Sequence, residues 1–193
     1  MRTMKIKTKR TVVFVSIIAI ALIVGILIGL CWDLYDRFAA PYKYQQYIEK
    51  YSAEYDIPEE IIFAVIKIES SFRASVTSPV GAMGLMQMMP DTFEWLTGNY
   101  HLGENLTTLS LYDPEINIKY GTYYLRYLKD KFGDWNTVLA AYNAGEGNVS
   151  KWLADERYSS DGKTLHTIPF AETENYVKKV NNEIGIYRIL YEK

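Results

Sequence analysis

Cysteine and histidine are nearly absent from this sequence of 193 residues. It contains one cysteine, Cys31, and two histidines, His101 and His166, which are far apart in the chain. A single cysteine excludes an intrachain disulfide, and two isolated histidines match no metal-ligand spacing. We therefore expect neither a metal nor another cofactor, and we interpret both histidines as exposed loop residues.

Positive charge is scarce outside the N-terminus. Of the 21 Lys and Arg residues, five lie within residues 1–10, which leaves 16 against 23 acidic residues from residue 11 onward. Nucleic-acid binding needs a dense basic surface, because its affinity comes from neutralising phosphates. We therefore expect no nucleic-acid partner.

Charge is missing altogether from residues 11–32, a run of Val, Ile, Leu, Ala, Phe and Gly. About 20 apolar residues suffice to cross a bilayer as a helix, so this run predicts a transmembrane helix. A cleaved signal has a shorter apolar region of about 7–15 residues and a small-x-small site, which residues 38–40 match poorly. The basic residues 1–10 predict a cytoplasmic tail, with everything from about residue 33 outside the membrane.

Alternation with a period of two, the signature of strands, is also missing. Apolar residues instead recur at helical spacing in two successive stripes, which are Tyr44, Tyr47, Ile48, Tyr51 and Tyr55, then Ile61, Val65, Ile68 and Phe72. The sequence predicts an all-α domain over residues 42–193, joined to the membrane helix by a linker at 33–41. The segment 157–169 is predicted to be a surface loop.

Start and stop signals divide this domain into helices. Asp56 with Pro58, Asp113 with Pro114, and Asp134 each predict a helix start. Gly145 and Gly147 are predicted to stop the helix that Asp134 begins. A last helix is predicted from about residue 172 to residue 191.

Glu69 is the carboxylate whose position most suggests chemistry. It follows Ile62 by seven residues and Val65 by four, which places it at the edge of an apolar helix face. It also lies near the predicted helix end, where the dipole disfavours negative charge. Both effects predict a raised pKa, and an acid that stays protonated near neutral pH can protonate a glycosidic oxygen. The alternative is an ordinary exposed glutamate.

A segment rich in glycine and methionine, residues 78–90, interrupts the helices. Gly81 and Gly84 allow the backbone to approach a ligand closely, and the Gln87 amide suits an N-acetyl or hydroxyl group. We expect no phosphate cradle here, because no strand precedes the segment and no lysine closes it. The alternative is a packing loop whose methionines fill gaps in the core.

Tyr142 and Asn143 lie at the end of a small-residue helix face, in the run Ala-Ala-Tyr-Asn-Ala-Gly at 140–145. Aromatic faces bind sugar rings and amides bind sugar hydroxyls, so this pair suits a carbohydrate ligand. The content of 17 tyrosines fits the same interpretation. The alternative is a buried tyrosine above a helix end.

Together these segments resemble the catalytic domain of the soluble lytic transglycosylases, a lysozyme-like family related to goose-type lysozymes. The matching motifs occur in the family's order at residues 69–72, 81–90, 141–145 and 168–177. They fall within a resemblance that covers about residues 42–188, and no motif position departs from the family's pattern. The resemblance implies a lysozyme-like helical fold for residues 42–193.

The resemblance also implies roles for individual residues. It implies that Glu69 is the catalytic acid and base. It further implies that the substrate is bound by Ser70, Ser78, Met86, Gln87, Tyr142, Asn143, Glu172 and Tyr176.

The implied substrate is peptidoglycan, cleaved between N-acetylmuramic acid and N-acetylglucosamine. Most glycosidases need two carboxylates, yet Asp91 and Glu94 look like charges in the first turn of a helix and Asp113 looks like a cap. In this family the substrate supplies the second group, because the muramic acid O6 hydroxyl closes a 1,6-anhydro ring. The expected partners are glycan strands and the membrane, and the sequence identifies no protein partner. A water-using muramidase, a non-catalytic peptidoglycan-binding protein and a tethered structural protein are the alternatives.

Overall fold

The computed structural model describes residues 2–100 and 106–191 and has helices but no strand among them. The predicted all-α class is therefore confirmed. The chain forms two compact units, Met1–Lys43 and Tyr44–Lys193. Of the two histidines, His101 lies outside the described residues, and His166 is exposed in a loop as expected.

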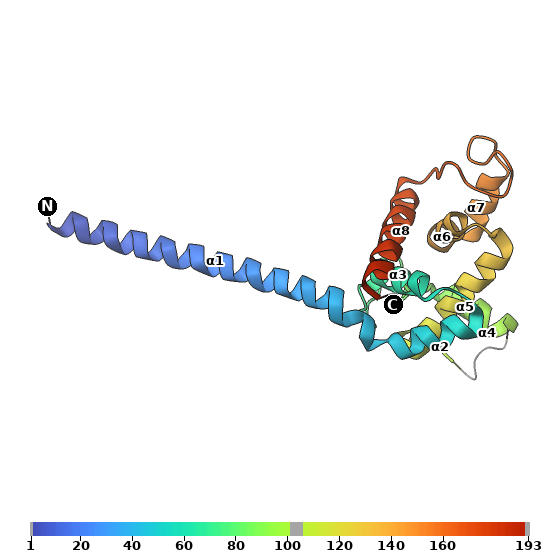
Figure 1. The fold of residues 1–193 in the computed structure, drawn as a ribbon, viewed down its shortest axis with the longest axis horizontal. Helices are drawn as coiled ribbons and strands as arrows, with labels where there is room; N and C mark the ends of the chain where they lie inside the picture. The colour runs from blue at the N-terminus through green and yellow to red at the C-terminus, as the bar shows by residue number, and fades with distance from the viewer. Residues whose placement is uncertain (1, 101–105, 192–193) are drawn as a thin grey trace. The chain divides into compact units, whose positions relative to one another are not determined.

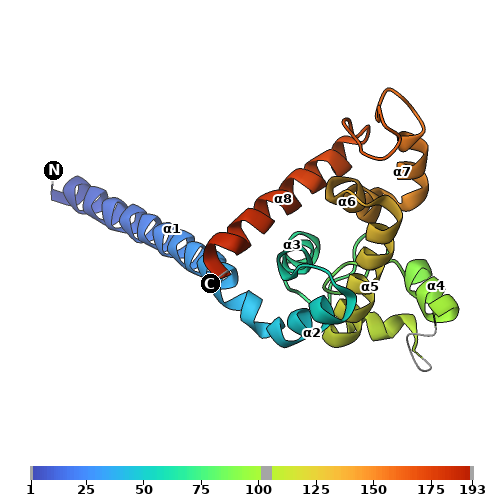
Figure 2. The ribbon, with the colours of Figure 1, turned by 45° about the vertical axis from the view of Figure 1, so that its right-hand side comes forward.

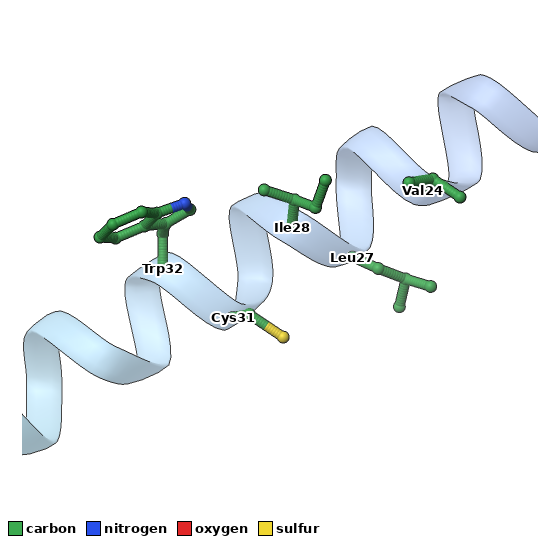
Figure 3. Close-up of a pocket in the computed structure, with 5 residues that line it drawn as sticks. All are labelled: Val24, Leu27, Ile28, Cys31 and Trp32. Carbon is green, nitrogen blue, oxygen red and sulfur yellow. The ribbon is translucent and has the colours of Figure 1, made fainter.

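The first unit is one long helix, α1 (Arg2–Lys43), drawn in blue in Figure 1. Its segment Thr11–Trp32 is long and apolar enough to cross a membrane, and its side chains are exposed. Figure 3 shows Val24, Leu27, Ile28, Cys31 and Trp32 around a shallow hollow that this helix forms alone. The predicted tail and linker, residues 1–10 and 33–41, are helical wherever they are described.

The second unit holds the remaining helices and one short 3-10 helix, η1. Their bounds are α2 (Gln45–Tyr55), α3 (Glu59–Ser70), α4 (Pro90–Tyr100), η1 (Thr108–Tyr112), α5 (Pro114–Phe132), α6 (Trp135–Ala144), α7 (Glu146–Leu153) and α8 (Ala171–Tyr191). The last helix agrees with the predicted 172–191 to within one residue. Between α7 and α8, residues 157–169 form turns and bends, as predicted.

A helix follows each of the three predicted starts, with α3 beginning at Glu59 directly after Pro58, and two of the three aspartates act as caps. The side chain of Asp113 accepts a hydrogen bond from the Ile116 amide at 3.0 Å, and Asp134 accepts one from Thr137 at 2.9 Å. Asp56, however, does not cap α3. This residue ends α2 in a left-handed conformation with φ of 53°, and Pro58 precedes α3 without a side-chain cap.

The predicted stop at residues 145–147 is only half right. Gly145 ends α6 with φ of 86°, a value that glycine adopts readily. However, α7 begins at Glu146, so Gly147 lies inside a helix. A single residue joins the two helices, because Gly145 is both the C-cap of α6 and the N-cap of α7.

α3 is buried on more of its surface than the single row of apolar residues in its sequence predicts. All six residues 61–66 are buried, because α3 packs against α8 and also contacts α2. Figure 2 shows α3 near the centre of this unit, with α8 on one side and α2 on the other. A helix that is hydrophobic all round belongs in a core. Glu69 therefore lies at the end of a core helix.

Candidate active site

Glu69 lies in the last turn of α3, where the backbone leaves the helix abruptly. Ser71 and Phe72 both have positive φ, 50° and 61°, which is rare for a bulky residue such as phenylalanine. The Phe72 ring is buried against Phe63, with ring centroids 5.1 Å apart. Packing thus holds this strained turn directly after the glutamate.

Burial raises the pKa of the Glu69 carboxyl from 4.5 to about 7, as the sequence predicted. The phenol of Tyr176 opposes part of this rise by interacting with the carboxylate. The Tyr176 hydroxyl is buried, and among the described residues it has no partner that meets the distance and angle of a hydrogen bond. No second carboxylate of the described chain contributes to the pKa of Glu69. Near neutral pH, this acid therefore exists in both protonation states.

Tyr142 faces the same carboxyl from α6. Burial and the charge of Glu69 raise the pKa of Tyr142 well above its ordinary value. Its hydroxyl donates to the backbone carbonyl of Met86 at 2.8 Å. Three elements, α3, α6 and α8, thus bring Glu69, Tyr142 and Tyr176 together.

Hydrogen bonds within the glycine- and methionine-rich segment hold its backbone in place. The side chain of Ser78 accepts a hydrogen bond from the Ala82 amide at 3.0 Å. The Gln87 amide donates to the carbonyls of Val76 at 3.1 Å and Gly84 at 2.8 Å, and Gln87 has a positive φ of 47°. The side-chain nitrogen of Gln87 therefore forms hydrogen bonds within the loop, and its side-chain oxygen is the atom that could bind a ligand.

The remaining residues of the predicted site differ in accessibility. Ser70 is only 1% exposed, with its hydroxyl donating to Ile66, and the Met86 side chain is fully buried. These two residues support the site from inside. Asn143 and Glu172 are exposed, and Asn143 accepts a hydrogen bond from Thr173 at 2.8 Å, which links α6 to α8.

Residues 46–165 match the family model of the transglycosylase SLT domain, which is more than half of the chain. The chain belongs to this family. It is 38% identical over 164 residues to the soluble lytic murein transglycosylase of Escherichia coli, covering 83% of this chain and 25% of that protein. It is 33% identical over 172 residues to the membrane-bound lytic murein transglycosylase C of Serratia proteamaculans, covering 76% and 47%. The chain thus spans between a quarter and a half of these curated relatives.

Solved structures of lytic transglycosylases share the fold. The 70-kDa soluble lytic transglycosylase of Escherichia coli has a TM-score of 0.72 at 35% identity, covering 86% of this chain and 27% of that one. An inactive mutant of lytic transglycosylase Slt from Pseudomonas aeruginosa, with glutamine in place of a glutamate, has a TM-score of 0.69 at 33% identity. That match covers 77% of this chain and 24% of that one.

Asn117 is the main residue of this SLT domain that sequence reasoning missed. It is fully buried on α5 and accepts a hydrogen bond from the Met86 amide at 2.7 Å. It also donates to the carbonyls of Met83 at 2.9 Å and Leu111 at 2.8 Å. Asn117 therefore ties the loop to α5 and fixes the backbone that receives the Tyr142 hydroxyl.

Two glycines make room for this arrangement. A Cβ at Gly84 would lie 2.2 Å from the Asn117 amide nitrogen, and one at Gly121 would lie 2.4 Å from the sulfur of Met86. For Gly84 the only signal in the sequence was the glycine content of the loop, and Gly121, which lies on α5, gave none. Gly84 meets atoms of α5 and η1, whereas Gly121 of α5 meets Met86 of the loop, so neither glycine shares a local pattern with its partners.

Proposed function

We propose that this chain is a membrane-anchored lytic transglycosylase that cleaves the β-1,4 bond between N-acetylmuramic acid and N-acetylglucosamine in peptidoglycan. The observation that carries the proposal is the buried carboxyl of Glu69, whose pKa of about 7 suits an acid that must later act as a base. Membership of the SLT family supports the same reaction class. So does the inactive glutamate-to-glutamine mutant of the similar Pseudomonas enzyme.

In the proposed reaction, Glu69 donates its proton to the glycosidic oxygen as the bond from C1 to that oxygen breaks. The N-acetyl oxygen of the muramic acid stabilises the positive charge that develops at C1. The ionised Glu69 then takes the proton of the O6 hydroxyl while O6 forms a bond to C1. The products are a free N-acetylglucosamine hydroxyl and a 1,6-anhydromuramoyl end. An attacking group on the same ring has a high effective concentration, so no water needs to be positioned.

The surrounding residues have distinct proposed roles. Tyr142 and Tyr176 cover the carboxyl, and their phenols bind the sugar beside it. Asn143, Glu172 and the free carbonyl oxygen of Gln87 bind its polar groups. Ser70, Ser78 and Met86 act through the backbone that they hold or belong to.

The anchor is proposed to be α1. Its segment Thr11–Trp32 meets the length and composition of a membrane span, and the similar Serratia protein is named as membrane-bound. The basic residues that precede the segment favour a cytoplasmic N-terminus. The catalytic unit would then face the peptidoglycan on the other side of the membrane.

The decisive experiment is mass analysis of the fragments that the full chain releases from purified sacculi. Anhydromuramoyl fragments are lighter by one water than the products of hydrolysis. Their formation by the parent chain, with loss of activity in Glu69→Gln, is the expected result. Glu94→Gln is the matched control, because Glu94 is an exposed carboxylate of α4, and its activity should equal that of the parent.

Other outcomes favour the alternatives. Reducing muramic acid ends as the main product would indicate a muramidase that uses water. Binding to sacculi without any release would indicate a non-catalytic binding protein. Full activity of Glu69→Gln would remove the assigned acid.

A further inference from the structure

Phe72 lies in the turn that follows Glu69, and its ring contacts two other aromatic rings. Phe63 of α3 meets it with centroids 5.1 Å apart, and Tyr44 stacks on it at 6.5 Å with the two planes 9° apart. All three residues are at most 5% exposed. Tyr44 therefore contributes to the burial of a ring that belongs to the turn after the proposed acid.

Tyr44 reaches this position from the start of α2 and not from α3. It is the first residue of the second unit and directly follows α1 in the chain. Its carbonyl accepts hydrogen bonds from the amides of Tyr47 at 3.0 Å and Ile48 at 3.1 Å, which fixes its backbone at the N-terminus of α2. The ring that covers Phe72 is thus held by a helix other than the one that carries Glu69.

The turn that Tyr44 helps to cover is strained. Ser71 and Phe72 have φ of 50° and 61°, which residues other than glycine keep only where the surrounding structure holds them. The Ser71 amide donates to the Lys67 carbonyl at 3.1 Å, so this turn also closes the last turn of α3. Without the ring contacts the backbone would relax, and the end of α3 would loosen. Because Glu69 lies in that last turn, water would then reach its carboxyl.

We propose that Tyr44 is a positioning residue, whose ring holds the turn at Phe72 and thereby keeps the Glu69 carboxyl out of water. Tyr44 acts through Phe72 and takes no part in the reaction itself. This inference rests on the proposed function, since it assumes that Glu69 is the acid. The sequence placed Tyr44 only in an apolar stripe, and such a stripe does not show which buried ring supports the site.

The expected consequence is a change in the pH range of activity. Burial raises the pKa of Glu69 to about 7, and the first step needs its protonated form, so activity should fall as the pH rises through this value. The phenols that face Glu69 are Tyr176 of α8 and Tyr142 of α6, and burial raises the pKa of both well above the ordinary value. Arg73, in the turn after Glu69, donates from its Nε to the Ser70 carbonyl at 3.0 Å. The fall in activity at high pH therefore reports on Glu69.

The test compares the pH dependence of fragment release from purified sacculi, between about pH 5 and about pH 9, for the full chain and its variants in detergent. Tyr44→Ala removes the ring, whereas Tyr44→Phe keeps it. Tyr51→Ala is the matched control. Tyr51 is a buried residue of α2 and stacks on Tyr55 at 6.0 Å with planes 11° apart. Tyr55 in turn meets Tyr123 of α5, so this second stack leads away from Phe72.

We expect the midpoint of the fall at high pH to move down by about one pH unit in Tyr44→Ala, which makes activity above the midpoint about tenfold lower than that of the parent. The direction follows from the pKa, because a carboxyl that water reaches returns toward 4.5. Near pH 5 the loss should be much smaller. Tyr44→Phe and Tyr51→Ala should keep the midpoint of the parent.

Circular dichroism establishes that each variant is folded. Tyr44→Leu, which keeps an apolar side chain but has no flat ring, should move the midpoint in the same direction and replaces Tyr44→Ala should that variant not fold. An unchanged midpoint in the folded variant would overturn the positioning role and leave the proposed function intact. The same loss of activity at every pH would also overturn it, because that loss indicates a structural role alone.

Two further outcomes count against the inference. An equal shift in Tyr51→Ala would overturn it, since a general loosening of α2 would then be the cause. Full activity of Glu69→Gln, or a parent whose activity does not fall at high pH, would instead count against the proposed function, and with it the role of Tyr44.

Discussion

Replacing Glu69 with glutamine should stabilise the fold above pH 7 and leave its stability near pH 4 almost unchanged. Burial raises the pKa of this carboxyl from 4.5 to about 7, so the folded chain keeps a proton that the unfolded chain has already released. The stability that this proton contributes is lost as the pH rises from 4.5 to about 7. Each tenfold difference in proton affinity corresponds to about 1.4 kcal/mol. The buried carboxylate should therefore lower the free energy of unfolding by roughly 3 kcal/mol above pH 7.

Glutamine keeps the shape of the side chain and cannot ionise. Its amide nitrogen still needs a hydrogen-bond acceptor in a buried place, so we expect a net gain of about 1–3 kcal/mol. Urea unfolding of the full chain in detergent, followed by tryptophan fluorescence at about pH 4 and about pH 8, measures the difference. Glu94→Gln, which makes the same chemical change at an exposed side chain, is the control. A Glu69→Gln variant as stable as its parent at both values would refute the claim that burial governs this carboxyl.

Three further outcomes are expected. Asn117→Leu removes the side chain that binds the Met86 amide and the Leu111 carbonyl, and leaves the Met83 carbonyl with the Met88 amide as its donor, so the free energy of unfolding in urea should fall by about 3 kcal/mol, and an unchanged midpoint would contradict this. Gly121→Ala should reduce the release of fragments from sacculi because its Cβ displaces Met86, whereas Gly185→Ala on α8 meets no atom within 4 Å and should retain full activity. After an alkaline wash the chain should stay with the membrane fraction, since apolar burial rather than charge would hold α1 there; its recovery in the supernatant would count against the anchor.

The position of Glu69 was predictable because its signals are local. Apolar residues three and four positions apart identify the face of a helix, and the following residues break it. The raised pKa followed from that placement and is confirmed. The local pattern predicted α8 only as a helix, and the family resemblance alone implied that Tyr176 of this helix lies at the site. Tyr176 reaches Glu69 from α8, more than a hundred residues later in the chain.

Asn117 was not predictable for the same physical reason. Its hydrogen bonds join backbone groups of residues up to 34 positions away, and a polar residue on a helix carries no sign of such partners. Asp56 was misread because an Asp before a Pro fits a helix start as well as the left-handed end of a preceding helix. In both cases tertiary contacts, and not the local sequence, determine what the residue does.

The turn after Glu69 links the strain in the fold to the proposed chemistry. Left-handed conformations at Ser71 and Phe72 cost of the order of 1–3 kcal/mol each, and burial of the Phe72 ring offsets that cost. A helix that continued past Ser70 would place Glu69 in its interior, away from the unsatisfied carbonyls of a helix end. Ending there keeps the acid in the last turn, where the helix dipole and burial both disfavour its ionised form. The strained turn thus favours the protonated state that the first step of the proposed reaction requires.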